Sequence, residues 1–84
     1  MAETVKSVVV KILREYRSLP LLSESEVRIN DLSRDDTRFI AKGEYKCQNI
    51  WGALVEKGTF DIALGKSDLQ PVRVKIYPGR SPVH

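Results

Sequence analysis

The longest run of alternating side chains in this sequence is Arg38-Phe39-Ile40-Ala41-Lys42-Gly43-Glu44-Tyr45-Lys46-Cys47. Its odd-numbered positions are apolar or small, and its even-numbered positions are charged apart from Ile40. This period of two is typical of a strand in an antiparallel sheet that has one face on a core and the other in water. We therefore expect a central strand over about residues 37–47. Gly43 lies on the core side of this pattern, where it permits a bend or a bulge, so that the sheet could curl around a helix.

Three other segments alternate in the same way and predict the remaining strands, at about residues 26–32, 58–65 and 71–77. Residues 31–37 are rich in turn formers and join the first of these strands to the central one as a hairpin. The order of the segments predicts an antiparallel meander. On the core face of the predicted sheet, the side chains that we expect from the other three strands are Val27, Ile29, Leu32, Phe60, Ile62, Leu64, Val72, Val74 and Ile76.

The N-terminal segment, about residues 3–18, has the period of an amphipathic helix. Pro20 is expected to stop this helix, and Val10 falls on its polar side. The sequence thus predicts an α+β fold in which an N-terminal amphipathic helix packs on a curved antiparallel meander of three to four strands. The apolar stripe of the helix consists of Val5, Val8, Val9, Ile12, Leu13 and Tyr16.

Residues 48–57 have no clean period and are too apolar for a solvated loop. They form either a bulged extension of the central strand or a helical turn that Gly58 ends. Four strands make a face about 19 Å wide and one helix is about 10 Å across, so the helix covers roughly half of that face. Trp51 accordingly either plugs the open edge of its own core or anchors a partner. The side chains that could cap the rest of the face, unless another subunit does, are Ile50, Trp51, Leu54 and Val55.

Length and composition indicate one small domain, residues 1–84, with a tail at residues 79–84. The chain has 42% hydrophobic and 30% charged residues and a formal net charge of +3, which is ordinary for a globular domain. Cys47 is the only cysteine, and no run of about 18 apolar residues occurs, so we expect a cytoplasmic protein without a membrane span. The order of elements, a helix followed by a meander, is similar to that of cystatin-like and other curved-sheet folds. This likeness is one of pattern alone, and no family motif in the sequence supports transferring a function from those folds.

No group of residues in the sequence predicts catalysis. The turn at residues 31–37 has the acid spacing that opens a calcium loop, but Asp36 and Lys42 stand where that loop needs a glycine and a bidentate acid. Cys47 lies on the core side of its strand, and the one histidine, His84, is the last residue. We therefore expect a protein that is not an enzyme and has no cofactor and no metal site.

Two candidate surfaces remain, and each predicts a different partner. The apolar segment at residues 50–55, with the uncovered part of the sheet, predicts a protein partner, first of all a second copy of this chain. The outward face of the sheet is mostly basic and predicts, as an alternative, binding of a nucleic acid. Glu44 and Asp61 could instead neutralise this face by pairing across strands. The basic face and its one aromatic side chain comprise Arg28, Arg38, Lys42, Lys46, Arg73, Lys75 and Tyr77.

Overall fold

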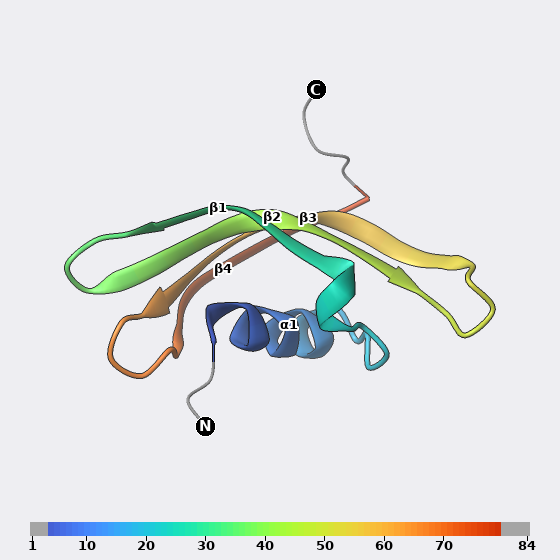
Figure 1. Cartoon of the computed structure of the whole chain (residues 1–84), viewed down its shortest axis with the longest axis horizontal. Helices are drawn as coiled ribbons and strands as arrows, with labels where there is room; N and C mark the ends of the chain where they lie inside the picture. Colours follow the sequence, from blue (N-terminus) through green and yellow to red (C-terminus); the bar gives the residue numbers. More distant parts are fainter. Residues whose placement is uncertain (1–3, 80–84) are drawn as a thin grey trace.

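A four-stranded antiparallel sheet arches over a single helix in the computed structural model, which describes residues 4–79 (Figure 1). The helix α1 (Val5–Tyr16) lies on the concave side of the sheet and is followed by a short 3₁₀ turn, η1 (Glu24–Glu26). The strands are hydrogen-bonded in the order of the chain, so the predicted meander and the α+β class are confirmed. They are β1 (Val27–Arg34), β2 (Arg38–Gln48), β3 (Leu54–Gly65) and β4 (Pro71–Pro78).

β2 lies inside the sheet and alternates as its sequence predicts. Ala41, Tyr45 and Cys47 on its concave side are buried, whereas Lys42 on the outer side is exposed. The neighbouring β3 alternates in phase with β2, since Ala41 pairs with Ile62, which is also buried. Both strands therefore turn their apolar side chains toward α1, and the core lies between the sheet and the helix.

Gly43 lies so close to the adjacent strand that no side chain fits there. A Cβ atom at this position would overlap the carbonyl oxygen of Arg28 and lie 2.8 Å from the ring of Phe60. The bulge itself is in the neighbouring strand β1, where Asn30 has no partner in the register with β2. The glycine thus permits the close approach of β1 on the concave side of the arch.

α1 begins after Thr4, whose side chain caps the first turn, and it ends at Tyr16. The predicted stop at Pro20 is wrong, because Ser18 already takes a left-handed backbone conformation with φ of 53°. The predicted place of Val10 on the polar side is also wrong, since this side chain is only 2% exposed. Val10 belongs to the hydrophobic core under the sheet, which arches over α1 (Figure 1).

The connector between α1 and η1 closes one end of the core. Leu19 and Leu22 are buried, whereas Leu21 between them is exposed. The Nε atom of Arg14 on α1 donates a hydrogen bond to the carbonyl oxygen of Leu22 at 2.7 Å. This bond holds the connector against the last turns of the helix.

Two apolar side chains that we expected on the core face are exposed. The register of β3 and β4 shifts between Ala63 and Leu64, so Val72 is the extra residue of a bulge and is 58% exposed. Leu32 pairs with Ala41 but is also exposed, because this end of β1 extends past α1 (Figure 1). The core therefore fills the middle of the arch, and the sheet continues beyond it at both ends.

Residues 48–57 form the hairpin between β2 and β3. Val55 has no partner in the register of these two strands, so it is the extra residue of a bulge. The helical turn ended by Gly58 is therefore wrong. The central strand β2 is extended only to Gln48, and the bulge lies in β3, which begins at Leu54. Both strands run further than expected, and only residues 49–53 are left for the turn.

No helix within residues 4–79 is long and apolar enough to span a membrane. The tail that the sequence predicts at residues 79–84 lies, from residue 80 onward, outside the described part of the chain.

Candidate interaction surfaces

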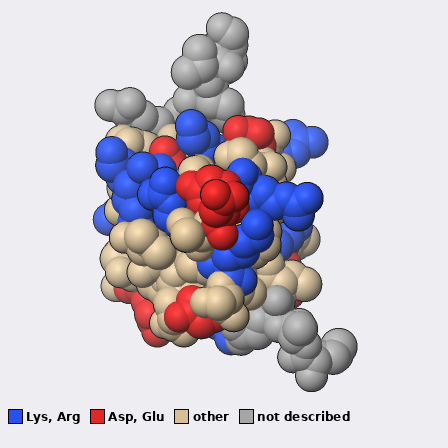
Figure 2. Space-filling model, turned by 90° about the vertical axis from the view of Figure 1, so that its left-hand side faces the viewer, with Lys and Arg blue, Asp and Glu red and all other residues tan. Residues whose placement is uncertain are grey.

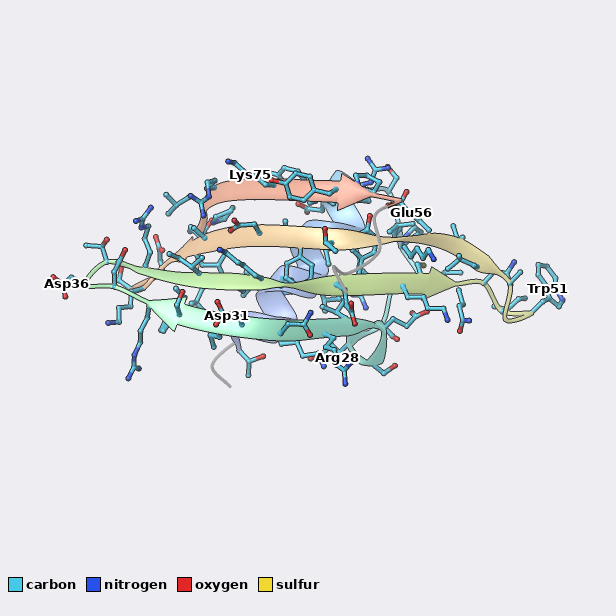
Figure 3. All side chains as sticks on the ribbon, turned by 90° about the horizontal axis from the view of Figure 1, so that it is seen from above. Arg28, Asp31, Asp36, Trp51, Glu56 and Lys75 are labelled. Carbon is cyan, nitrogen blue, oxygen red and sulfur yellow. The ribbon has the colours of Figure 1, made fainter. Side chains whose placement is uncertain are left out.

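The hairpin between β2 and β3 projects past the end of α1 and carries two exposed apolar side chains at its tip (Figures 1 and 3). Trp51 is 83% exposed and Ile50 is 78% exposed. Trp51 lies at the opposite end of the sheet from Asp36 and points away from the body of the protein (Figure 3). The interpretation of Trp51 as a plug for its own core is therefore wrong.

Hydrogen bonds to Asn49 hold the tip of this hairpin in one conformation. The side-chain Oδ1 of Asn49 accepts hydrogen bonds from the backbone N–H groups of Trp51 and Ala53, both at 2.9 Å. The backbone N–H of Gly52, a residue with φ of 80°, donates to the carbonyl oxygen of Asn49 at 3.0 Å. The backbone of the tip is thus a defined turn, and this turn carries the two exposed apolar side chains.

Three more exposed apolar side chains lie on the hairpin and beside it. Leu54 and Val55 begin β3, and Leu21 belongs to the connector after α1. Val55 and Leu21 line a shallow, almost entirely apolar groove of about 100 Å³ between the hairpin and the connector, together with Leu19 and Cys47. We term the exposed set the hairpin-end patch, which consists of Leu21, Ile50, Trp51, Leu54 and Val55.

One carboxylate ties the base of the hairpin to α1. Arg17 at the end of α1 donates from Nε and Nη2 to the two carboxylate oxygens of Glu56, both at 2.9 Å. The hydroxyl of Tyr45 on β2 donates to the same carboxylate at 2.5 Å. The hydrogen bonds from Arg17 lower the pKa of Glu56 despite its partial burial, and burial raises the pKa of Tyr45. We call this group the Arg17–Glu56–Tyr45 clamp.

The outer face of the sheet carries charges that alternate in sign across the strands. One row crosses all four strands and brings Lys42 of β2 between an acid on β1 and an acid on β3. Opposite charges in facing positions attract, so much of this face is internally neutralised. In order from β1 to β4, the row consists of Asp31, Lys42, Asp61 and Lys75.

Three of the seven residues predicted to bind nucleic acid form an ion pair with an acid. The ion pairs are Arg28–Glu44 at 3.8 Å, Arg38–Asp35 at 3.0 Å and Arg73–Asp61 at 3.0 Å. Tyr77 also faces outward, opposite Thr59 of β3. The structure thus brings most of the predicted residues to one face, but it surrounds them with acidic side chains.

Arg38 lies apart from the others, at the turn between β1 and β2. In this turn Asp35 accepts hydrogen bonds from the backbone N–H groups of Thr37 and Arg38, both at 2.8 Å. These bonds and the Arg38 side chain lower the pKa of Asp35 to about 2. The turn is therefore held by Asx hydrogen bonds. Figure 2 looks onto this end of the molecule, where Lys and Arg side chains flank acidic ones.

Lys46 and Lys57 break the alternation of charge, because they stand directly opposite each other on β2 and β3. Within the described part of the chain, neither lysine side chain has an ion pair or a hydrogen bond. They line a hollow of about 620 Å³ that Arg28 also borders. The structure thus joins Arg28 and Lys46 of the predicted set to Lys57, which the sequence pattern did not single out.

Cys47, the residue considered as a nucleophile, is buried in the core. Burial raises the pKa of its thiol, and the nearby carboxylates of Glu26 and Glu56 raise it further. Over residues 4–79, no three His, Cys, Asp or Glu side chains are grouped so that they could hold a metal ion. His84 lies outside the described residues.

Comparison of the chain with protein-family models, with curated proteins and with solved structures finds no match. The resemblance to cystatin-like folds therefore rests only on the order of the helix and the strands along the chain.

Proposed function

We propose that this protein is a small non-catalytic interaction module that forms a homodimer through the hairpin-end patch. The observation that carries the proposal is the exposure of Trp51 and Ile50 at the tip of a hydrogen-bonded turn. A hydrogen-bonded turn loses little backbone conformational entropy when a partner covers it, and tryptophan is enriched among residues that dominate binding energy.

The size of the hairpin-end patch supports a second copy as the partner. With roughly 200 Å² for a large apolar side chain, the exposed fractions of its five members amount to on the order of 600 Å² for each copy. A standard interface buries about 800 Å² for each partner, so the patch and its rim are of the right order.

The arrangement of the hairpin favours symmetric pairing. It carries both a projecting apolar tip and an apolar groove beside Val55. In a two-fold dimer, each tip would lie against the groove of the other copy. The apolar tip and the apolar groove would then both be shielded from water. Within residues 4–79, β4 pairs with β3 only from Gly58 onward, so residues 54–56 also have a strand edge open on that side.

Nucleic-acid binding by the outer face is the weaker alternative. A face that tracks phosphates needs cations that remain available, but Arg38 and Arg73 are each paired with an acid at 3.0 Å. Lys42 lies between two aspartates, and Tyr77 is one aromatic side chain where a stacking platform needs several. The apolar patch therefore supports self-association more strongly than the basic face supports nucleic-acid binding.

Sedimentation of the purified protein at low and high salt tests the proposal. We expect a dimer that persists or tightens as salt rises, because apolar association is not screened. Trp51→Ser should weaken dimerisation by at least tenfold. Val72→Ser is the matched control, since Val72 is also an exposed apolar side chain but lies at the other end of the sheet, and it should leave dimerisation unchanged. A monomer at all concentrations, or equal effects of both variants, would refute the proposal.

A further inference from the structure

The facing pair Lys46 and Lys57 is unfavourable in a protein that has nothing bound beside it. Like charges directly opposite on adjacent strands repel each other. Elsewhere on the outer face the corresponding positions hold opposite charges, as where Lys42 faces Asp61. This cross-strand pair of lysines therefore departs from the charge pattern of the paired strands within residues 4–79. An anion held between the two ammonium groups would relieve its repulsion.

The hollow over these lysines has the size and the donors for such an anion. Its volume of about 620 Å³ lies within the usual range for sites of small ligands. Arg28 stands on one wall and contacts Glu44 only loosely, at 3.8 Å, so its guanidinium can turn toward a bound anion. Ser25 and Gln48 add polar residues to the lining of the hollow.

Two carboxylates also border the hollow, and they differ in how much they oppose an anion. Glu26 accepts hydrogen bonds from the backbone N–H of Ser23 at 3.0 Å and of Gln48 at 2.8 Å, so both of its oxygens are already occupied. Glu44 has Arg28 as its counter-ion. Three cations therefore face two carboxylates, and both oxygens of one of these, Glu26, already accept hydrogen bonds.

We propose that this hollow binds a phosphate group, with Lys46 and Lys57 on either side of it and Arg28 as the third cation. A phosphate monoester carries up to two negative charges and three acceptor oxygens, which suits two ammonium groups and a guanidinium better than a singly charged carboxylate does. The site does not depend on dimerisation, because its cations all belong to one copy of the chain.

Thermal unfolding without a ligand tests the charge argument first. Lys57→Gln should raise the midpoint temperature, because it removes the repulsion from Lys46. Lys42→Gln removes the same charge but should lower the midpoint, since Lys42 lies between Asp31 and Asp61. Both shifts should shrink in high salt. If Lys57→Gln lowers the midpoint as Lys42→Gln does, the facing lysines are not strained and the proposal fails.

Titration with phosphoserine and with a short thymidine oligonucleotide, followed by the backbone amide resonances of β2 and β3, tests binding. Lys46→Gln with Lys57→Gln should weaken phosphoserine binding by about tenfold or more, as expected for loss of two charged donors. The control pair Lys42→Gln with Lys75→Gln changes the net charge equally and should weaken it less than about twofold.

The two probes also distinguish the source of the phosphate. Tighter binding of phosphoserine supports a phosphate monoester, and tighter binding of the oligonucleotide supports a nucleic-acid backbone, provided that Lys46 and Lys57 control the affinity in either case. Absence of binding to both probes, or equal losses in the two double variants, would overturn the proposal.

Discussion

Glu56 is the residue that ties the base of the projecting hairpin to the helix. Its carboxylate joins the end of α1, through Arg17, to β2, through Tyr45. The Glu56 side chain is 20% exposed, so the two-pronged hydrogen bond from Arg17 is shielded from water more than a surface ion pair would be. Removal of this charge leaves a guanidinium and a phenol without their shared partner.

Glu56→Gln should therefore lower the free energy of unfolding by about 1–2 kcal/mol at neutral pH. The pKa of Glu56 is lowered in the folded protein, chiefly by the hydrogen bonds from Arg17. Its stabilisation is thus complete above the unfolded pKa, near 4.3, and disappears as the pH falls through the folded pKa. Urea unfolding of wild type and variant across this range measures the difference. A gap that stays constant down to the lowest pH would show that the charge of Glu56 does not contribute.

At the scale of the elements, the curvature of the sheet depends on bulges and on one glycine. Asn30, Val55 and Val72 are the unpaired residues of β1, β3 and β4, and Gly43 lets β1 approach β2 beside the first of them. Bulges bend strands and increase their twist, so the sheet can arch over a helix narrower than itself.

Gly43→Ala should destabilise the fold by about 3 kcal/mol, because the new Cβ would overlap the backbone of β1 and press on Phe60. Gly52→Ala is a useful contrast, since nothing lies near a Cβ there and only the positive φ of 80° costs energy, about 1–2 kcal/mol. Chemical denaturation of both variants gives the comparison. An equal or smaller loss for Gly43→Ala would mean that the strands separate there at little cost.

The elements with a clean period were predictable from the sequence, and those interrupted by bulges were not. The alternation of β2 and the core face of β3 follow directly from side-chain order. Val72 was misplaced because a bulge shifts the phase of a strand without a mark in the sequence, and Val10 because helical period alone does not tell how far a sheet wraps. The bulge at Val55 likewise shifts the phase of β3 next to Glu56. The sequence pattern therefore did not assign Glu56 to a face of the sheet and did not predict its role in the clamp.

At the scale of the whole molecule, the exposed apolar side chains of the hairpin lie at one end of the arch, and polar turns lie at the other (Figures 1 and 3). The sequence singled out residues 50–55 as a candidate surface, and the structure adds Leu21 to them from a distant segment. Lys57 likewise lies beside Lys46 only because β3 pairs with β2 in this register. Such contacts depend on register, which side-chain patterns define poorly in a segment without a clean period.

Fluorescence of Trp51 measured over a dilution series is the most direct test of dimerisation through the hairpin-end patch. Trp51 is the only tryptophan of the chain, so its emission reports on this one position. As the protein concentration rises through the range in which sedimentation detects the dimer, the emission maximum should move to shorter wavelength, because the indole leaves water. A dimer that forms while the emission of Trp51 remains that of a solvent-exposed indole would contradict our account.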